Sequence, residues 1–409
     1  MPKQMKLGIV QIRYLYRSFV FILLCLIISS CTEQYAFKTS TFENILVIQA
    51  NITNEYKKQE IKISRSYRFE ENGPTNEEGA NVYVTDSDNN TYQFGFEKIS
   101  GLYVSNNEFQ AVPEKTYQLN VITKEGKSYS SNVQSLTPVS EIQVEPKIAT
   151  IDGQKGVQIV VSSYDPDAKS KFYRYEYDET YKVIAPSWTS EKLIVAPFTT
   201  NGHPDFLVVP RTEETRICYT TKKSDDLFLL NTLGLSEDRI NYPIRFIDIK
   251  SPILNERYSI IVRQYIQNLE SYTYYQTLKS LSTSKSIFSQ VQPGFNYGNL
   301  KSNDDPSEKI IGFFEVSSIS SKRIFFNFRD IFIDDPYPPY YFECYITPYS
   351  NCWTERGCGG NKILSLVNGS GTEQVYYGAD DKGNFYFVTA PCGDCTKISS
   401  NIRPLFWRD

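Results

Sequence analysis

The residues of this sequence that are best suited to chemistry are its cysteines, because histidine is nearly absent. The 409 residues include eight Cys and a single His. One His excludes metal sites built on several imidazoles and zinc-protease helices of the H-E-x-x-H type. A Ser-His-Asp triad would have to use His203, which lies in the turn-like residues 201–205 and has no accompanying G-x-S-x-G motif. We therefore expect His203 to be a surface residue without a catalytic role.

Cys31 follows a stretch that predicts an export signal. Residues 1–30 contain four basic residues and no acid, and residues 19–28 form an apolar run that is too short to span a membrane. An aliphatic residue and two serines then precede Cys31, and this order resembles a bacterial lipobox. The resemblance implies cleavage before Cys31 and acylation of its sulfur and its new amine, so that several acyl chains would anchor the protein stably. An ordinary secretory signal that happens to contain a cysteine is the alternative.

Besides Cys31 and the signal-peptide Cys25, six cysteines remain: Cys218, Cys344, Cys352, Cys358, Cys392 and Cys395. Disulfides persist outside the cytoplasm, so an even number of cysteines in an exported protein predicts structural disulfides, whose connectivity the sequence leaves open. Five of the six fall within residues 344–395, which predicts a stapled C-terminal segment.

Two other uses of these cysteines stay open. The spacing Cys392-x-x-Cys395 is that of a thioredoxin-like redox pair, although no helical pattern follows it. Four cysteines could instead hold zinc, although the gap between the first two is wider than usual: Cys352, Cys358, Cys392 and Cys395. We favour structural disulfides, because both the compartment and the spacing suit them.

Acidic residues suggest two further kinds of site. Four residues have the spacing of a calcium loop: Asp86, Asp88, Asn90 and Glu97. Such a loop needs glycine where Thr91 stands, so a hairpin turn rich in Asp and Asn is the better interpretation. Hydrolysis by two carboxyl groups is compatible with 47 acidic residues, but spacing along the chain does not show whether two of them flank a cleft. We expect no metal and no cofactor.

A proline-rich segment, residues 336–342, offers a possible contact surface made of Tyr337, Tyr340 and Tyr341. Rigid tyrosine rings bind proteins or sugars at a low cost in entropy. The alternative is that these rings cover a sheet edge, where proline prevents further strand pairing. We favour the covering role.

The elements that must position these residues are mostly strands. Short stretches of alternating polar and apolar residues, separated by turn residues, recur from residue 45 onward. They predict a mainly β protein with an N-terminal Ig-like β-sandwich over residues 42–138. A second, larger β-rich domain is expected over residues 139–409, ending in the cysteine-rich part. Residues 1–30 would be the signal peptide and residues 31–41 a tether.

One short helix is expected within the second domain, at about residues 271–283. Tyr274, Tyr275, Leu278 and Leu281 recur there at helical spacing, and Ser271 is a suitable N-cap.

The charge of the chain excludes one class of partner. Removal of residues 1–30 takes away four basic residues and lowers the formal net charge from −4 to −8. An acidic protein of this kind lacks the basic face that nucleic-acid binding requires.

Several short sequence segments occur in the same order as in a known protein family, which this sequence resembles. They include residues 46–53, 79–82, 117–119 and 126–131, and the final run from Cys392 to Trp407. The order and spacing resemble a family of Bacteroidetes outer-membrane lipoproteins known as domain of unknown function 4249. The resemblance covers nearly the whole exported chain. It implies an outer-membrane lipoprotein that is typically encoded beside a TonB-dependent receptor, and it assigns no catalytic or ligand-binding residues.

We therefore expect a non-enzymatic accessory lipoprotein, anchored by lipid on the periplasmic or the cell-surface face of the outer membrane. It would bind an outer-membrane barrel protein such as a TonB-dependent transporter, and it could help to capture that transporter's ligand. A stand-alone adhesin that binds glycans or peptides is the main alternative, and a hydrolase with paired carboxylates is a third.

Overall fold

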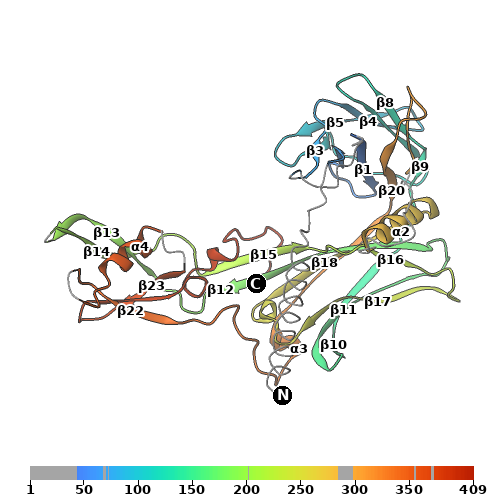
Figure 1. Ribbon diagram of the computed structural model, residues 1–409. Helices are drawn as coiled ribbons and strands as arrows, with labels where there is room; N and C mark the ends of the chain where they lie inside the picture. The colour runs from blue at the N-terminus through green and yellow to red at the C-terminus, as the bar shows by residue number, and fades with distance from the viewer. Residues whose placement is uncertain are drawn as a thin grey trace, which may run out of the picture. The chain divides into compact units, whose positions relative to one another are not determined.

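The computed structural model describes residues 44–67, 71, 73–200, 202–283, 298–353, 356–369 and 373–409. The signal peptide, Cys31 and the tether lie outside these residues, so the predictions about them stay predictions. In the described part of the chain, strands far outnumber helices (Figure 1). The mainly β fold predicted from the alternation of polar and apolar residues is confirmed.

The first sheet contains eleven strands, and its main path runs β19-β8-β7-β4-β5-β6-β2-β1-β20. Residues that alternate along each strand point inward, as Leu46, Ile48, Ala50 and Ile52 do along β1. The strands are β1 (Leu46–Thr53), β2 (Glu60–Arg65), β3 (Thr75–Asn76), β4 (Asn81–Asp86), β5 (Thr91–Glu97), β6 (Leu102–Ser105), β7 (Thr116–Ile122), β8 (Ser128–Ser131), β9 (Gln134–Ser135), β19 (Leu300–Ser302) and β20 (Ile310–Ser317).

The two ends of this sheet meet, so that it nearly forms a barrel. The side chain of Asn299, next to β19, donates a hydrogen bond to the carbonyl of Phe314 on β20 and accepts one from its N–H, both at 2.8 Å. The amide side chain thus takes the place of a neighbouring peptide group. A Cβ on Gly298 would lie 1.5 Å from the carbonyl oxygen of Gly312, so this close approach requires glycine.

The first sheet draws on more of the chain than residues 42–138, where a separate sandwich was predicted. β20 pairs in parallel with β1 over its whole length, from Leu46 opposite Ile310 to Thr53 opposite Ser317. Parallel strands need a long connection, and strands β2 to β19 lie between these two along the chain. Local patterns could not show this pairing, because they carry information only about neighbouring residues.

Two further sheets share the largest hydrophobic core. One has the order β10-β11-β17, and the other has the order β15-β12-β18-β21 with β16 also paired to β12. Their strands are β10 (Ile142–Ile151), β11 (Gln154–Asp165), β12 (Phe172–Ile184), β15 (Ile217–Lys223), β16 (Phe228–Asn231), β17 (Asp238–Asp248), β18 (Tyr258–Gln267) and β21 (Ile319–Phe326). Val157, Ile159 and Val161 of β11 alternate into this core, so the opposite face of the β10-β11-β17 sheet stays outside it.

A smaller core lies between the β13-β14 hairpin, the β22-β24-β23 sheet and helix α4. Its elements are β13 (Glu191–Thr200), β14 (His203–Pro210), β22 (Ile346–Ser350), α4 (Gly360–Val367), β23 (Gln374–Ala379) and β24 (Asn384–Thr389).

The predicted helix is α2 (Leu269–Thr283), which begins two residues earlier than expected. Ser271 is not its N-cap, because Asn268 accepts the hydrogen bond from the Ser271 N–H at 2.8 Å. The prediction of a single helix was wrong, because the described residues also contain helix α4. The sequence pattern did not predict α4 because two glycines stand at its start, and glycine disfavours helix. Ile363 and Leu366 stabilise α4 by packing into the small core. The remaining helical turns are η1 (Pro252–Leu254), α3 (Phe328–Ile331), α5 (Ala390–Gly393) and η2 (Cys395–Lys397).

A buried charge pair joins the first sheet to the second part of the fold. Arg174 of β12 reaches Glu315 of β20 at 3.2 Å, and both side chains are almost fully buried. Glu315 also accepts hydrogen bonds at 3.0 Å from Gln267 of β18 and from the hydroxyl of Ser271 in α2. The Arg174 guanidinium lies over the ring of Tyr265, 4.0 Å from its centroid. Four elements, β12, β18, α2 and β20, therefore meet at one carboxylate.

The pKa of Arg174 is raised above its ordinary value. Burial alone would lower it, but the electrostatic influence of Tyr275 and of the carboxylates of Glu315 and Glu176 outweighs burial.

Replacing Glu315 with Gln should lower the free energy of unfolding by about 3 kcal/mol or more, because it removes the principal buried counter-charge of Arg174. Urea unfolding monitored by tryptophan fluorescence measures the change. Glu55→Gln is the control, since Glu55 forms an exposed pair with Lys57 at 2.7 Å and its loss should cost at most about 1 kcal/mol. Equal effects of the two substitutions would contradict the role given to Glu315.

Candidate functional site

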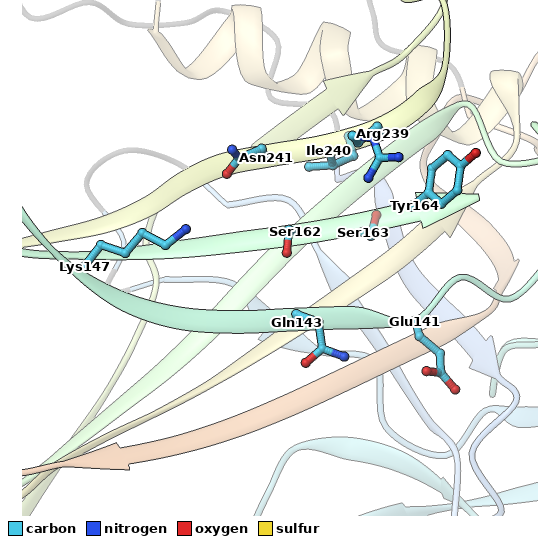
Figure 2. A pocket seen from close by; sticks show the side chains of 9 residues that line it. All are labelled: Glu141, Gln143, Lys147, Ser162, Ser163, Tyr164, Arg239, Ile240 and Asn241. Atoms are coloured by element: carbon cyan, nitrogen blue, oxygen red, sulfur yellow. The ribbon is translucent and has the colours of Figure 1, made fainter. Parts of the chain in front are cut away.

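A polar groove of about 440 Å³ lies on the outer face of the β10-β11-β17 sheet (Figure 2). Strand register places Gln143 of β10 opposite Ser162 of β11, and Ser162 opposite Asn241 of β17. These three side chains form a row across the sheet. Beside it, Tyr164 of β11 is opposite Arg239 of β17, and Glu141 just before β10 lines the same groove. One acidic, one aromatic and three neutral polar side chains therefore share a surface with Arg239.

The alternation of the strands explains this composition. Ile142 and Val144 point into the core, so Glu141 and Gln143 point outward. The same rule turns Ser162 outward and Val161 inward on β11. The polar residues are therefore on one face because three strands pair in this register, and a shift by one residue would bury them.

The polar row has no partners of its own. In the part of the chain that the structure describes, the side chains of Glu141, Gln143, Ser162 and Asn241 make no hydrogen bond and no ion pair. Arg239, by contrast, has partners: its Nε donates to Glu237 at 3.0 Å in an exposed ion pair, and its guanidinium lies 4.1 Å from the centroid of the Tyr164 ring. The groove therefore combines an oriented aromatic ring with free hydrogen-bonding groups.

A second groove, of about 500 Å³, lies between α2 and β20. It is more apolar, and Leu269, Tyr274 and Phe313 line it together with Glu270. Each of the two grooves contains one acidic residue, so neither supplies the pair of carboxylates that glycoside hydrolysis uses.

All six predicted disulfide cysteines are bonded. The pairs are Cys218–Cys395, Cys344–Cys392 and Cys352–Cys358. Cys392 and Cys395 have different partners, so they form neither a redox pair with each other nor a zinc site with the other cysteines. Among the described residues, no group of three or more potential ligands could hold a metal ion.

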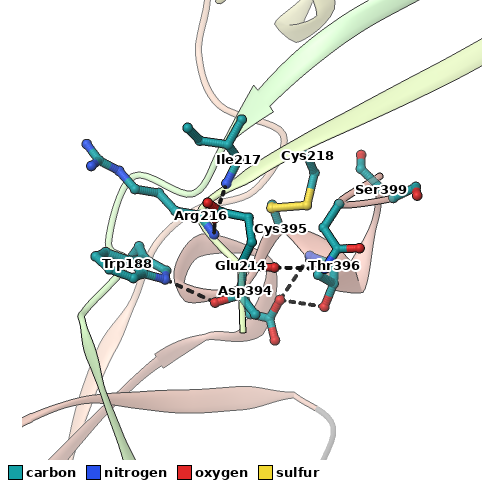
Figure 3. Close-up of a disulfide and its surroundings, with 12 residues drawn as sticks. Trp188, Glu214, Arg216, Ile217, Cys218, Asp394, Cys395, Thr396 and Ser399 are labelled. Atoms are coloured by element: carbon teal, nitrogen blue, oxygen red, sulfur yellow. Dashed lines mark hydrogen bonds between the residues drawn. A yellow bond between two sulfur atoms is a disulfide. The ribbon is translucent and has the colours of Figure 1, made fainter. Parts of the chain in front are cut away.

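The Cys218–Cys395 disulfide fixes the C-terminal segment onto β15 (Figure 3). The Cys395 N–H donates to the carbonyl of Thr215 at 2.9 Å, and Asp394 caps the turn that follows by accepting from the Thr396 N–H at 2.9 Å. Both sulfur atoms lie in fully buried residues of the large core. The disulfide therefore links residues 177 positions apart inside the core.

A family model described as Domain of unknown function (DUF4249) matches residues 32–323, which is more than half of the chain. The chain belongs to the DUF4249 family. The polar groove lies inside the matched region of this DUF4249 protein, whereas five of the six bonded cysteines follow it. No protein with a curated function matches the chain.

The DUF4249 chain has no helix, within the residues described, that is long and apolar enough to cross a membrane. This finding concerns helices alone, and the lipid anchor predicted at Cys31 lies outside the described residues.

The calcium-like spacing at Asp86 is a hairpin turn. Asp86 accepts hydrogen bonds from the backbone N–H groups of Asp88 and Asn90, from the hydroxyl of Tyr92 and from Lys115 at 2.8 Å. Burial alone would raise the pKa of Asp86, but the hydrogen bonds from Lys115 and Asn90 outweigh it and hold the pKa well below its usual value.

The same turn occurs again near the C-terminus, which the sequence analysis missed. Asp380 accepts from the N–H of Asn384, from its side-chain amide and from the hydroxyl of Tyr386 at 3.0 Å. These hydrogen bonds, those of Asn384 first, lower the pKa of Asp380 to about 2. Both turns have Asp, then Asn four residues later and Tyr six residues later, and that spacing was the available signal.

His203 begins β14, directly after the β13-β14 turn, and its ring stacks on Trp353 with centroids 4.9 Å apart. The described contacts give it a packing role.

The three tyrosines of the proline-rich segment divide between two environments. The Tyr340 hydroxyl donates to the carbonyl of Pro391 at 2.8 Å, and Tyr341 stacks on Tyr181, so both pack against the large core. Tyr337 remains half exposed, with Arg329 over its ring at 4.4 Å. The covering role suits Tyr340 and Tyr341, and only Tyr337 offers a contact surface.

The groove itself was not found from the sequence. The alternation of polar and apolar residues over 141–147 indicated a strand with one polar face. It did not show which strands would lie beside β10 and complete the groove.

Replacing Asp86 with Asn should cost about 2 kcal/mol near neutral pH, because it removes a buried, charge-assisted set of hydrogen bonds. An unfolded Asp has a pKa of about 3.9, and the native pKa is lower. The stabilisation is therefore complete above about pH 5 and is lost as the pH falls toward the native pKa. Urea unfolding of wild type and variant between about pH 7 and pH 3 should show the difference shrinking, and a constant difference would contradict the assignment.

The matched control for this measurement is Asp380→Asn. Its turn has the same hydrogen-bond pattern, but Asp86 also receives the ammonium group of Lys115 at 2.8 Å. We expect a smaller loss of stability for Asp380→Asn.

The disulfides should differ in their contribution to stability. The chain-entropy model gives about 5 kcal/mol for the Cys218–Cys395 loop and about 2 kcal/mol for the short Cys352–Cys358 loop. Replacing both cysteines of a pair with Ser, one pair at a time, avoids free thiols. Urea unfolding should then show the larger loss for the Cys218–Cys395 variant, and the reverse order would contradict the model.

Proposed function

We propose that this DUF4249 protein is a non-enzymatic accessory lipoprotein of the outer membrane that binds a partner outer-membrane protein, most specifically a TonB-dependent transporter. The lipobox at Cys31 supports the lipid anchor, and three disulfides support a location outside the cytoplasm. The observation that carries the partner role is an apolar projection in the C-terminal segment, which we define as Ile402 and Leu405.

Both side chains of the projection are largely exposed. Leu405 is fully exposed, at 106 %, and Ile402 is 77 % exposed. Exposed apolar side chains of this size are ones that a partner protein can bury. Burying two such side chains in a partner would contribute several kcal/mol, at roughly 1.5–3 kcal/mol for each.

The backbone that carries the projection is held in place before any partner binds. Tyr219 and Ser400 exchange backbone hydrogen bonds of 2.7 and 3.2 Å. Trp407, which is buried, packs against Tyr219 and Phe325 with ring centroids 5.0 and 5.8 Å apart. A preorganised contact loses little conformational entropy on binding. The projection is therefore held by backbone and aromatic contacts before a partner binds.

The alternatives have weaker support. A stand-alone adhesin would need a ligand surface, and the polar groove could serve one, but an adhesin gives the apolar projection no role. Neither of the two grooves described above supplies the second acid that a carboxylate-pair hydrolase needs.

The test is purification of the full-length protein from detergent-solubilised membranes with an antibody, followed by mass spectrometry. Wild type should bring down an outer-membrane barrel protein. The double variant Ile402→Glu/Leu405→Glu should lose it, because two charges would have to be buried in the interface. Wild type that brings down no outer-membrane protein would overturn the proposal.

Two controls sharpen this experiment. Leu233→Glu/Leu235→Glu changes two other exposed leucines, between β16 and β17, and should keep the partner. Loss of the partner in both double variants would mean that the projection is not the contact. Cys31→Ser should release the protein from the membrane fraction, which tests the anchor separately.

A further inference from the structure

The polar groove of the β10-β11-β17 sheet has the features of a ligand site, and they are independent of the apolar projection. Gln143, Ser162 and Asn241 form its central row, and their side chains have no hydrogen-bond partner within the described residues. The row crosses two strand spacings, or about 9–10 Å. Amides and hydroxyls both donate and accept, so the row suits a ligand with many neutral groups that do the same.

An aromatic ring lies beside the middle of this row, two residues along β11 from Ser162. Tyr164 is 45 % exposed, and the guanidinium of Arg239 supports it at 4.1 Å from its centroid. Arg239 also forms an exposed ion pair with Glu237 at 3.0 Å. A supported tyrosine ring offers a flat apolar surface with little rotational freedom to lose.

The charges of the groove argue against an anionic ligand. Arg239 is already paired with Glu237, and Lys147 lies 3.3 Å from Glu145. Glu141 has no ion pair within the described residues. Its carboxylate would repel a phosphate, but it would accept strong hydrogen bonds from hydroxyl groups.

The position of the groove argues against an extended peptide. Peptides add to a sheet edge or place side chains in apolar pockets. This groove lies on the face of a sheet. Its aromatic group is the exposed ring of Tyr164, which offers a flat surface in place of an apolar pocket.

We propose that this groove binds a neutral oligosaccharide. The row of Gln143, Ser162 and Asn241 would hydrogen-bond the hydroxyl groups of successive sugar rings, and Glu141 would accept from further hydroxyls. The Tyr164 ring would stack on the apolar C–H face of one sugar. The groove holds the saccharide without cleaving it, because a second carboxylate does not line it.

The test uses the purified full-length protein in detergent and isothermal titration calorimetry. The probes are five neutral hexasaccharides: cellohexaose, maltohexaose, laminarihexaose, xylohexaose and mannohexaose. At least one should bind the wild type. Tyr164→Ala should weaken that binding about 10-fold, and so should Gln143→Ala/Asn241→Ala. Tyr164→Phe should stay within about threefold of wild type, because the ring is kept.

The control is Gln154→Ala, which changes an exposed glutamine on the same strand, β11, outside the groove and should bind like wild type. Thermal unfolding of each variant separates loss of binding from loss of folding. Binding to none of the five saccharides, or equal weakening by Gln154→Ala, would overturn the proposal. Binding of a random hexapeptide mixture in place of the saccharides would assign the groove to peptides and would also overturn it. The measurement needs no partner protein, so its outcome is distinct from that of the co-purification.

Discussion

The carboxylate of Glu315 is the point on which the arrangement of the fold depends. It lies on β20, which closes the first sheet, and it pairs with Arg174 of β12 while accepting hydrogen bonds from β18 and α2. Buried charges are stable only when they are paired and hydrogen-bonded. Arg174 also pairs with Glu176 on its own strand, but the buried carboxylate of Glu315 reaches Arg174 only where β20 and β12 lie together, and this contact gives the junction its specificity.

The residues after β20 strengthen the same junction. Ser318 stands between β20 and β21, and its N–H donates to the hydroxyl of Thr137 at 2.8 Å. Thr137 in turn donates to the carbonyl of Ile266 at the end of β18. The chain thus passes from the first sheet to the large core through a hydrogen-bonded link, without a free linker. Hydrogen bonds and a buried ion pair hold this junction, whereas hydrophobic packing holds each core.

The two proposed contact surfaces depend on different supports. Strand register alone produces the polar groove, because it sets three outward-facing polar side chains side by side. The C-terminal projection depends on covalent and aromatic anchors, namely the Cys218–Cys395 disulfide and Trp407. If both proposals hold, the protein would bind a saccharide at one surface and a membrane partner at the other.

The sequence by itself determined the β class, helix α2, the disulfide role of six cysteines and the turn at Asp86. Each of these follows from the local pattern: alternation of polar residues, helical spacing, an even cysteine count or a missing glycine. Only the tertiary structure decided the parallel pairing of β1 with β20, the disulfide partners, helix α4 and the polar groove. The physical reason is the same for all four. They depend on which distant residues meet, and that choice depends on burial of core side chains and of the pair between Arg174 and Glu315.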